Sequence, residues 1–456
     1  MKKKFNYIRN KLGIDGAIAY TTLSRIIQVI GGIVSVFLVA SLLDGIELGF
    51  YYTFASILAI QVFFELGLNG IIIQYVAHET AYLREVDKNY QGNEANLSRI
   101  SSLLHFTVKW FSTLAIFVFI LLISVGFVFF NSYFNSDHYV DWFLPWVLLS
   151  VGTTMNFIIS PILAFLEGLG KVKDIAKIRV FQQLISIIVL WSCLIFGYKL
   201  YAGGISSIIG VLLLVLILRK RFLTILQNIY RQKITEKVSY RVEIFPLQWR
   251  IALSWIGGYF IFQLFNPVLF ANEGPIVSGQ MGMTLSILNA VLALSYGWVA
   301  TKTPIFSSYI AQKDYLSLDK LFNRTFLQSS FVIIIGLIGV FFTIVFIRYF
   351  DIYVGGEPLS DKFLPFLPLF FMMISFLMNH VIGSWAVYLR CHKKEPMLLN
   401  SIVYGGLSCV STLILGNKYG LMGITSGYCI ISILIAFWAY KIFINKKMKW
   451  HLNEKY

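Results

Sequence analysis

The chain has 456 residues, of which 57% are hydrophobic and only 13% are charged, and its mean hydropathy is +0.74. Soluble domains carry about 25% charged residues, so this composition excludes a soluble globular protein and indicates a polytopic membrane protein. The formal net charge of +16 reflects basic residues between apolar runs. We attribute it to membrane topology and expect no nucleic-acid partner.

Long apolar runs follow one another along the whole chain. A membrane-spanning helix needs about 20 mostly apolar residues, and the sequence predicts twelve such helices. We expect the first to be retained rather than cleaved as a signal peptide. The predicted spans are 15–43, 46–78, 105–131, 142–168, 176–197, 200–218, 249–272, 278–311, 326–350, 362–390, 396–416 and 420–444.

The basic residues alternate between the predicted loops. Of the 38 lysines and arginines, 31 fall in the two termini and every second loop, and four fall in the opposite loops. Lys and Arg concentrate on the cytoplasmic side of membrane proteins, so this pattern predicts that both termini are cytoplasmic.

The longest predicted loop lies at the midpoint of the chain. It is basic, and it separates two stretches of six predicted helices each. We therefore predict an N-terminal six-helix bundle over 1–218, a cytoplasmic linker over 219–248 and a C-terminal six-helix bundle over 249–456. Repeated bundles of this kind are common among transporters.

Motifs for cofactor or metal chemistry are lacking in the sequence. There is no GxxxxGK[ST] phosphate-binding loop and no CxxC pair among the four cysteines. No Ser, His and Asp pattern indicates a catalytic site. We expect no cofactor, no metal and no enzymatic activity.

The first predicted helix carries a polar stripe that includes a charge. Arg25, Gln28, Gly32 and Ser35 recur at spacings of three and four, which places them on one helix face. Ionisable residues inside membrane helices cost roughly 2.5 to 3.5 kcal/mol and mark functional sites. The stripe either lines a cavity or packs against another helix.

The second predicted helix places Glu65 in the membrane, with Asn69 one turn later on the same face. Counting about 1.5 Å per residue puts Arg25 and Glu65 at similar depth in the cytoplasmic half of the membrane. Two interpretations of Arg25 stay open: it binds an anionic substrate, or it forms a structural ion pair with Glu65.

The eighth predicted helix contains Lys302 just before Pro304, a predicted hinge. Proline frees a backbone carbonyl, which suits a helix that lines a cavity. Lys302 either faces that cavity or extends to the headgroups. Asn289 in the same helix joins Arg25, Gln28, Asn69 and Lys302 as a candidate substrate-binding residue.

Three further polar or hinge positions lie within apolar runs. Pro267, after Asn266, is a predicted hinge in the seventh helix, and Glu167 ends the fourth. We group Glu65, Glu167 and His380 as candidates for ion coupling or gating. For His380, hydrogen-bonded packing is the alternative interpretation.

Several segments together resemble a known family. These are "ELGLNGIIIQYVAHE" (65–79), "LEGLGKVKDIAKIR" (166–179), "WIGGYFIFQLFNPVLF" (255–270) and "TKTPIF" (301–306). The pattern is similar to that of bacterial polysaccharide-biosynthesis proteins, the O-antigen flippase-like members of the multidrug/oligosaccharidyl-lipid/polysaccharide exporter superfamily. Many relatives carry a basic residue nine positions after the helix-2 acid, where this sequence has Gln74.

The resemblance implies an all-α fold of twelve membrane helices in two six-helix bundles, as in MATE transporters. It also implies a flippase of the bacterial inner membrane that moves a polyprenyl-pyrophosphate-linked oligosaccharide for O-antigen, lipopolysaccharide or another surface polysaccharide. Its expected partners are this lipid-linked oligosaccharide, membrane lipids and the polysaccharide polymerase machinery. The alternatives are a MATE-type cation-coupled exporter of small molecules and a membrane-embedded glycan polymerase or ligase.

Overall fold

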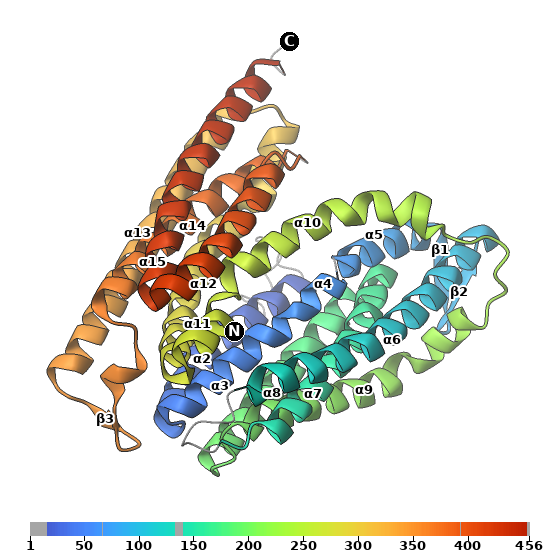
Figure 1. The fold of residues 1–456 in the computed structure, drawn as a ribbon. Helices are drawn as coiled ribbons and strands as arrows, with labels where there is room; N and C mark the ends of the chain where they lie inside the picture. The colour runs from blue at the N-terminus through green and yellow to red at the C-terminus, as the bar shows by residue number, and fades with distance from the viewer. Residues whose placement is uncertain (1–15, 66, 133–139, 393, 454–456) are drawn as a thin grey trace, which may run out of the picture. The chain divides into compact units, whose positions relative to one another are not determined.

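The computed structural model describes residues 16–65, 67–132, 140–392 and 394–453, and nearly all of them are helical (Figure 1). The first elements in chain order are α2 (Gly16–Leu42), α3 (Gly45–Leu58), η1 (Ala59–Gln61), α4 (Val62–Glu65), α5 (Leu68–Thr80), β1 (Leu83–Val86), β2 (Asn89–Gly92), α6 (Glu94–Asn131), α7 (Phe143–Leu166), the π-helical η2 (Glu167–Lys171), α8 (Val172–Ile195), α9 (Tyr201–Tyr230) and the π-helical η3 (Tyr240–Ile244). The remaining elements are α10 (Phe245–Phe262), α11 (Phe265–Glu273), α12 (Pro275–Ala311), α13 (Tyr315–Tyr349), β3 (Tyr353–Val354), β4 (Glu357–Pro358), η4 (Leu359–Lys362), α14 (Phe366–Arg390) and α15 (Leu398–Asn453).

The helices confirm the predicted all-α membrane fold. Within the described chain, eight helical runs are long and apolar enough to cross a membrane. Two of them, Phe143–Ile195 and Leu398–His451, have 53 and 54 residues. Each is long enough for two crossings at about 20 residues per crossing. The count of twelve crossings and the side of the termini stay predictions.

Glycine changes the direction of the chain inside both of these long runs. Gly170 has φ 83° and Gly420 has φ 56°. This left-handed region favours glycine because it has no Cβ. The predicted spans 142–168 and 176–197 meet around Gly170, and the spans 396–416 and 420–444 meet at Gly420.

Contacts divide the chain into two compact units. Unit 1 contains the described residues before Val36 together with Leu58–Trp255, and unit 2 contains Val36–Ile57 together with Ile256–Tyr456 as far as the chain is described. The contacts thus place the end of α2 and all of α3 but Leu58 in unit 2. The predicted division into 1–218, 219–248 and 249–456 stays a prediction.

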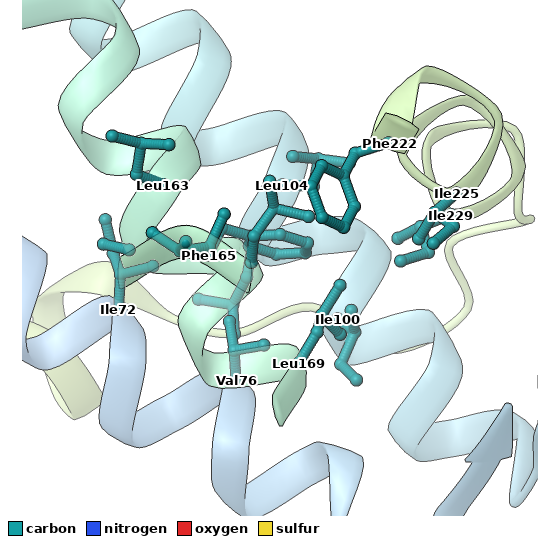
Figure 2. Close-up of a cluster of buried hydrophobic side chains, with 14 of the residues drawn as sticks. Ile72, Val76, Ile100, Leu104, Leu163, Phe165, Leu169, Phe222, Ile225 and Ile229 are labelled. Carbon is teal, nitrogen blue, oxygen red and sulfur yellow. The ribbon is translucent and has the colours of Figure 1, made fainter. Parts of the chain in front are cut away.

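Unit 1 is built around α6, α7, α8 and α9, which pack against one another (Figure 1). A buried apolar cluster joins α5, α6, η2 and α9 and includes Val76, Ile100, Leu169 and Phe222 (Figure 2). Close packing of such side chains gains many small dispersion contacts. The cluster holds α5 and η2, the two elements that carry much of the polar site described below.

Unit 2 packs α12, α13, α14 and α15 together, and it also holds the turn between α2 and α3. Lys362, only 3% exposed, donates hydrogen bonds to the carbonyls of Ala40 (3.0 Å) and Leu43 (2.6 Å). Its Nζ lies 3.3 Å from Glu357, whose carboxylate accepts from the Gly45 N–H (3.2 Å). The pair therefore satisfies carbonyls at the end of α2 and an amide at the start of α3.

Candidate functional site

Unit 1 contains a polar cluster at a break in the second predicted helix. Gly67 has φ 69° and separates α4 from α5. Asn69 Nδ2 donates to the Glu65 carboxylate and to Ser160 Oγ on α7, the latter at 2.7 Å. Asn69 Oδ1 is buried and has no hydrogen-bond partner among the described residues. A buried oxygen of this kind costs free energy unless another group meets it.

The cluster continues along one face of α7. Gly152, Asn156 and Ser160 follow one another at intervals of four, which aligns them on a helix. Asn156 Nδ2 donates to Ser207 Oγ on α9 (3.3 Å), and its Oδ1 accepts from Gln182 Nε2 on α8 (3.4 Å). Polar groups therefore run from α4 and α5 across α7 to α8 and α9, all within unit 1.

An ion pair lies at the end of α7. Arg179 Nη2 is 3.2 Å from Glu167 Oε1, and the Glu167 side chain is only 15% exposed. The Arg179 guanidinium also attracts the Glu65 carboxylate electrostatically. Arg179 therefore pairs with Glu167 and contributes a positive charge near Glu65.

The local sequence around Glu167 explains its position. Glu167–Lys171 is the kink between α7 and α8, where Gly170 has a positive φ. A Cβ on Gly168 would lie 2.6 Å from the Cβ of Val76, so only glycine lets this turn approach α5 so closely. The backbone of "EGLGK" thereby holds Glu167 against the rest of unit 1.

Unit 2 contains a second polar cluster, centred on His380 of α14. The fully buried His380 ring has Ser295 Oγ 3.2 Å from Nδ1, and Ser329 and Ser330 Oγ 3.3 and 3.4 Å from Nε2. Ser295 and Ser329 donate their hydroxyl protons to the backbone carbonyls of Leu292 and Phe326. Ser295 can therefore accept from Nδ1–H, and Ser330 can donate to Nε2. This arrangement suits a neutral ring protonated on Nδ1.

Asn379, next to His380, is also fully hydrogen-bonded. Its Nδ2 donates to the Tyr428 hydroxyl (2.8 Å), and its Oδ1 accepts from Tyr404 (2.8 Å). Its backbone carbonyl accepts from Tyr296 (2.7 Å). The ring of Phe326 also lies nearly parallel to that of His380, with centroids 6.1 Å apart.

The other predicted site residues are distributed over both units. Arg25 belongs to α2, but its side chain lies outside what the structure describes. Gln28 on α2 and Asn289 on α12 are exposed, and Lys302 is half-buried. The structure brings together Glu65 and Asn69 by a hydrogen bond, and it pairs Glu167 with Arg179.

The two predicted hinge prolines differ in their surroundings. Pro267 is the third residue of α11 and follows a break after Phe262, whereas α12 continues through Pro304 as a helix. Whether either proline moves during function stays a prediction.

Sequence reasoning missed Ser160, Asn156, Gln182 and Arg179. The signal for the first two was present, because the spacing of four between them places polar atoms on one face of an apolar run. Arg179 was counted with the loop charges of the topology prediction. The structure places it instead in α8, in contact with Glu167.

The long apolar helices define a multi-pass membrane protein, and their arrangement is like that of MATE transporters. No protein-family model matches the chain, and no curated protein sequence matches it. The chain is similar in structure to an inward-facing multidrug resistance MATE family transporter, with a TM-score of 0.64 and 11% identity over 95% of this chain and 98% of that one.

Two further solved structures show the same fold. One is the lipid II flippase MurJ in an inward closed conformation, with a TM-score of 0.63 and 15% identity over 95% of this chain and 90% of that one. The other is a MOP superfamily transporter from Pyrococcus furiosus, described as having a binding pocket of reverse polarity. It has a TM-score of 0.51 and 11% identity over 94% of this chain and 95% of that one. These likenesses establish the fold.

Proposed function

We propose that the chain is a flippase that moves a polyprenyl-pyrophosphate-linked oligosaccharide across the bacterial inner membrane. The observation that carries this proposal is the likeness, over 95% of the chain, to a structure described as a lipid II flippase. Alternating access by rocking of residues 1–218 against 249–456 would expose the substrate first to one side of the membrane and then to the other.

Basic residues in two apolar helices suit such a substrate. Arg25 belongs to α2, and the half-buried Lys302 belongs to α12. Arginine binds pyrophosphate through its planar fork of donors, and lysine binds it as a point charge. Both attractions strengthen where water is excluded. We assign Arg25 and Lys302 to the pyrophosphate, and Gln28, Asn69 and Asn289 to polar contacts with the substrate.

The Glu65 cluster is our candidate for ion coupling. It combines a carboxylate, the Ser160 hydroxyl and the Asn69 carbonyl oxygen, which has no partner in the described part of the chain. Such oxygen ligands suit a hard cation, and a carboxylate can take up a proton instead. Entry of a sodium ion or a proton would weaken the attraction between Glu65 and Arg179, and this change would couple the ion to movement of the helices.

A second candidate function is cation-coupled export of small organic molecules. It is favoured by the carboxylates Glu65 and Glu167, which lie in one polar cluster of unit 1. The likeness to a multidrug resistance transporter agrees with it. Purified protein in proteoliposomes separates the candidates, because a flippase would expose a fluorescent polyprenyl-pyrophosphate oligosaccharide to the opposite leaflet and an exporter would accumulate an organic cation.

The role of Arg25 can be tested in cells that lack their own flippase for a surface polysaccharide. We expect Arg25→Ala to abolish surface polysaccharide at normal protein abundance and Arg25→Lys to restore part of it, because lysine keeps the charge but not the fork. Lys109→Ala is the matched control, since Lys109 is an exposed basic residue of α6.

Two outcomes would contradict this role. Normal export by Arg25→Ala would remove Arg25 from the site. If instead Arg25→Ala lowers protein abundance and a second change, Glu65→Gln, restores it, Arg25 pairs structurally with Glu65.

A further inference from the structure

The basic end of α15 contains a groove that the proposed transport function does not use. Two adjoining cavities, each of about 480 Å³, lie between the α14–α15 connection and α15. Both are lined by Pro396, Lys446 and Lys449. Lys394 and Trp450 line the first, and the second extends along α15 to Trp438. This groove lies entirely within unit 2.

The α15 wall of the groove carries both apolar and basic side chains. This wall consists of side chains three or four positions apart, which places them on one helix face. They are Trp438, Lys441, Ile442, Asn445, Lys446 and Lys449. At about 1.5 Å per residue, Trp438 and Lys449 are roughly 17 Å apart. Trp438 and Ile442 therefore lie toward the apolar part of α15, with Lys441 between them, and Lys446 and Lys449 lie at the other end.

The neighbouring acidic side chains do not neutralise these lysines. Glu395 lines the groove, but both of its carboxylate oxygens accept from Arg390 at 2.8 to 3.0 Å. Lys447, on another face of α15, is paired with Asp319 at 2.9 Å. By contrast, Lys446 and Lys449 form no ion pair with any acidic residue of the described chain.

Aromatic side chains fix the position of the basic end. Lys394 Nζ lies 5.1 Å from the centroid of the Trp450 ring, a cation–π contact. Trp450 is buried and also contacts the His392 ring, with centroids 4.7 Å apart. The connection before α15 is thereby held against the helix, and Lys394 faces the same cavity as Lys446 and Lys449.

We propose that this groove binds an anionic phospholipid, with the headgroup phosphate at Lys394, Lys446 and Lys449 and an acyl chain along Ile442 and Trp438. Clusters of basic residues at the end of a membrane helix attract anionic headgroups. Tryptophan is favoured at the boundary between headgroup and hydrocarbon. Trp438 and Ile442 extend the groove along α15 beyond Lys446 and Lys449. An acyl chain would use these apolar side chains, whereas a free phosphate ion would not need them.

The test uses the full-length protein purified in a neutral detergent and measures lipid retained by native mass spectrometry and the midpoint of thermal unfolding. The added probes are phosphatidylglycerol, phosphatidylcholine and inorganic phosphate. We expect phosphatidylglycerol alone to be retained and to raise the midpoint. The double substitution Lys446→Gln and Lys449→Gln should weaken its retention roughly tenfold or more, because two of the three headgroup charges are lost.

The matched control is the double substitution Lys173→Gln and Lys177→Gln, which removes two exposed lysines of α8 in unit 1. It should retain phosphatidylglycerol as the unaltered protein does. A third variant, Trp438→Ala, should weaken retention of the lipid and leave any effect of inorganic phosphate unchanged.

Three outcomes would overturn the proposal. An equal loss of phosphatidylglycerol retention in both lysine double variants would mean a general charge effect. Equal retention of phosphatidylcholine would mean that the groove does not select charge. Stabilisation by inorganic phosphate as strong as that by the lipid would mean a free-anion site. A midpoint in phosphatidylcholine that matches that of the unaltered protein shows that each variant is folded.

Discussion

Unit 1 contains a polar cluster around Asn69 and unit 2 contains one around His380, both within apolar helices. The two clusters differ in how completely their polar atoms are hydrogen-bonded. Around His380, both ring nitrogens and every polar atom of the neighbouring Asn379 side chain have partners. Around Asn69, a carboxylate and an arginine are present, and the Asn69 Oδ1 atom is buried without a partner in the described chain.

This difference separates a structural cluster from one prepared to bind. A saturated neutral network stabilises one arrangement of α12, α13 and α14, because any movement breaks its hydrogen bonds. A cluster that contains a nearby charge and an oxygen without a partner among the described residues is stabilised when a cation or proton enters. We therefore assign His380 to packing and Glu65 to coupling, and the first two predictions below test that assignment.

The largest effect is expected for His380→Ala. The substitution leaves a cavity in unit 2 and removes the parallel contact with Phe326. We expect it to lower the free energy of unfolding by about 3 kcal/mol, which chemical denaturation of the purified protein measures. His380→Gln keeps most of the volume and a hydrogen-bonding amide, so it should recover part of this loss.

Transport per folded molecule should be unchanged in both His380 variants. If His380→Gln is stable and abundant yet does not transport, then His380 is a coupling residue after all, and the contrast between the clusters fails.

The second-largest effect is expected for Glu65→Gln. Glu65→Gln keeps an oxygen that accepts from Asn69 but removes the charge, so the fold should persist. We expect ion-coupled transport in proteoliposomes to fall roughly tenfold to a hundredfold, which corresponds to about 1.4 to 2.7 kcal/mol. Glu65→Asp keeps the charge and should retain more transport.

The matched control for Glu65→Gln is Gln182→Leu, which removes a polar side chain from the same cluster without changing its charge. It should have the smaller effect on coupling. Equal transport by Glu65→Gln and the unaltered protein, with and without an ion gradient, would contradict the assignment.

The sequence predicts much of the fold but only part of the cluster. Apolar runs define the helices because burial in lipid acts on each run separately, so α2 at Gly16–Leu42 agrees closely with the predicted span 15–43. Spacing along one helix also places Glu65 and Asn69 on a common face. The contact of Asn69 with Ser160 joins residues 91 positions apart. It depends on how α5 packs against α7, which no local pattern encodes.

The turn at Glu167–Lys171 gives a second example. The charges after Glu167 look like a loop because positive residues collect at membrane surfaces. The glycines at 168 and 170 instead allow a tight kink between α7 and α8, and this kink places Glu167 beside Arg179. The topology prediction used the charge of Arg179 and could not assign it a partner.

The smallest effect is expected where a charged network in unit 1 joins η3 to α5 and α6. Arg99 donates to Glu79 (2.9 Å) and to Glu243 in η3 (2.6 Å), and the Ser239 N–H donates to Glu243 (2.8 Å). Burial by itself would raise the pKa of Glu243. The hydrogen bonds from Ser239 and Arg99, together with the charge of Arg99, outweigh it and lower this pKa below 4.5.

A lowered pKa in the folded state means that Glu243 stabilises the protein above the pKa of the unfolded chain and loses this contribution as the pH falls through the folded pKa. Glu243→Gln should therefore destabilise unit 1 by at most about 1 kcal/mol at pH 7, since the pair is partly exposed. The difference in unfolding midpoint between Glu243→Gln and the unaltered protein should disappear below pH 4.5. The exposed Glu236 in the same connection supplies the control, because Glu236→Gln should leave the midpoint unchanged at both pH values. A gap that persists at low pH would show that packing of the Glu243 side chain, rather than its charge, holds η3 to α6.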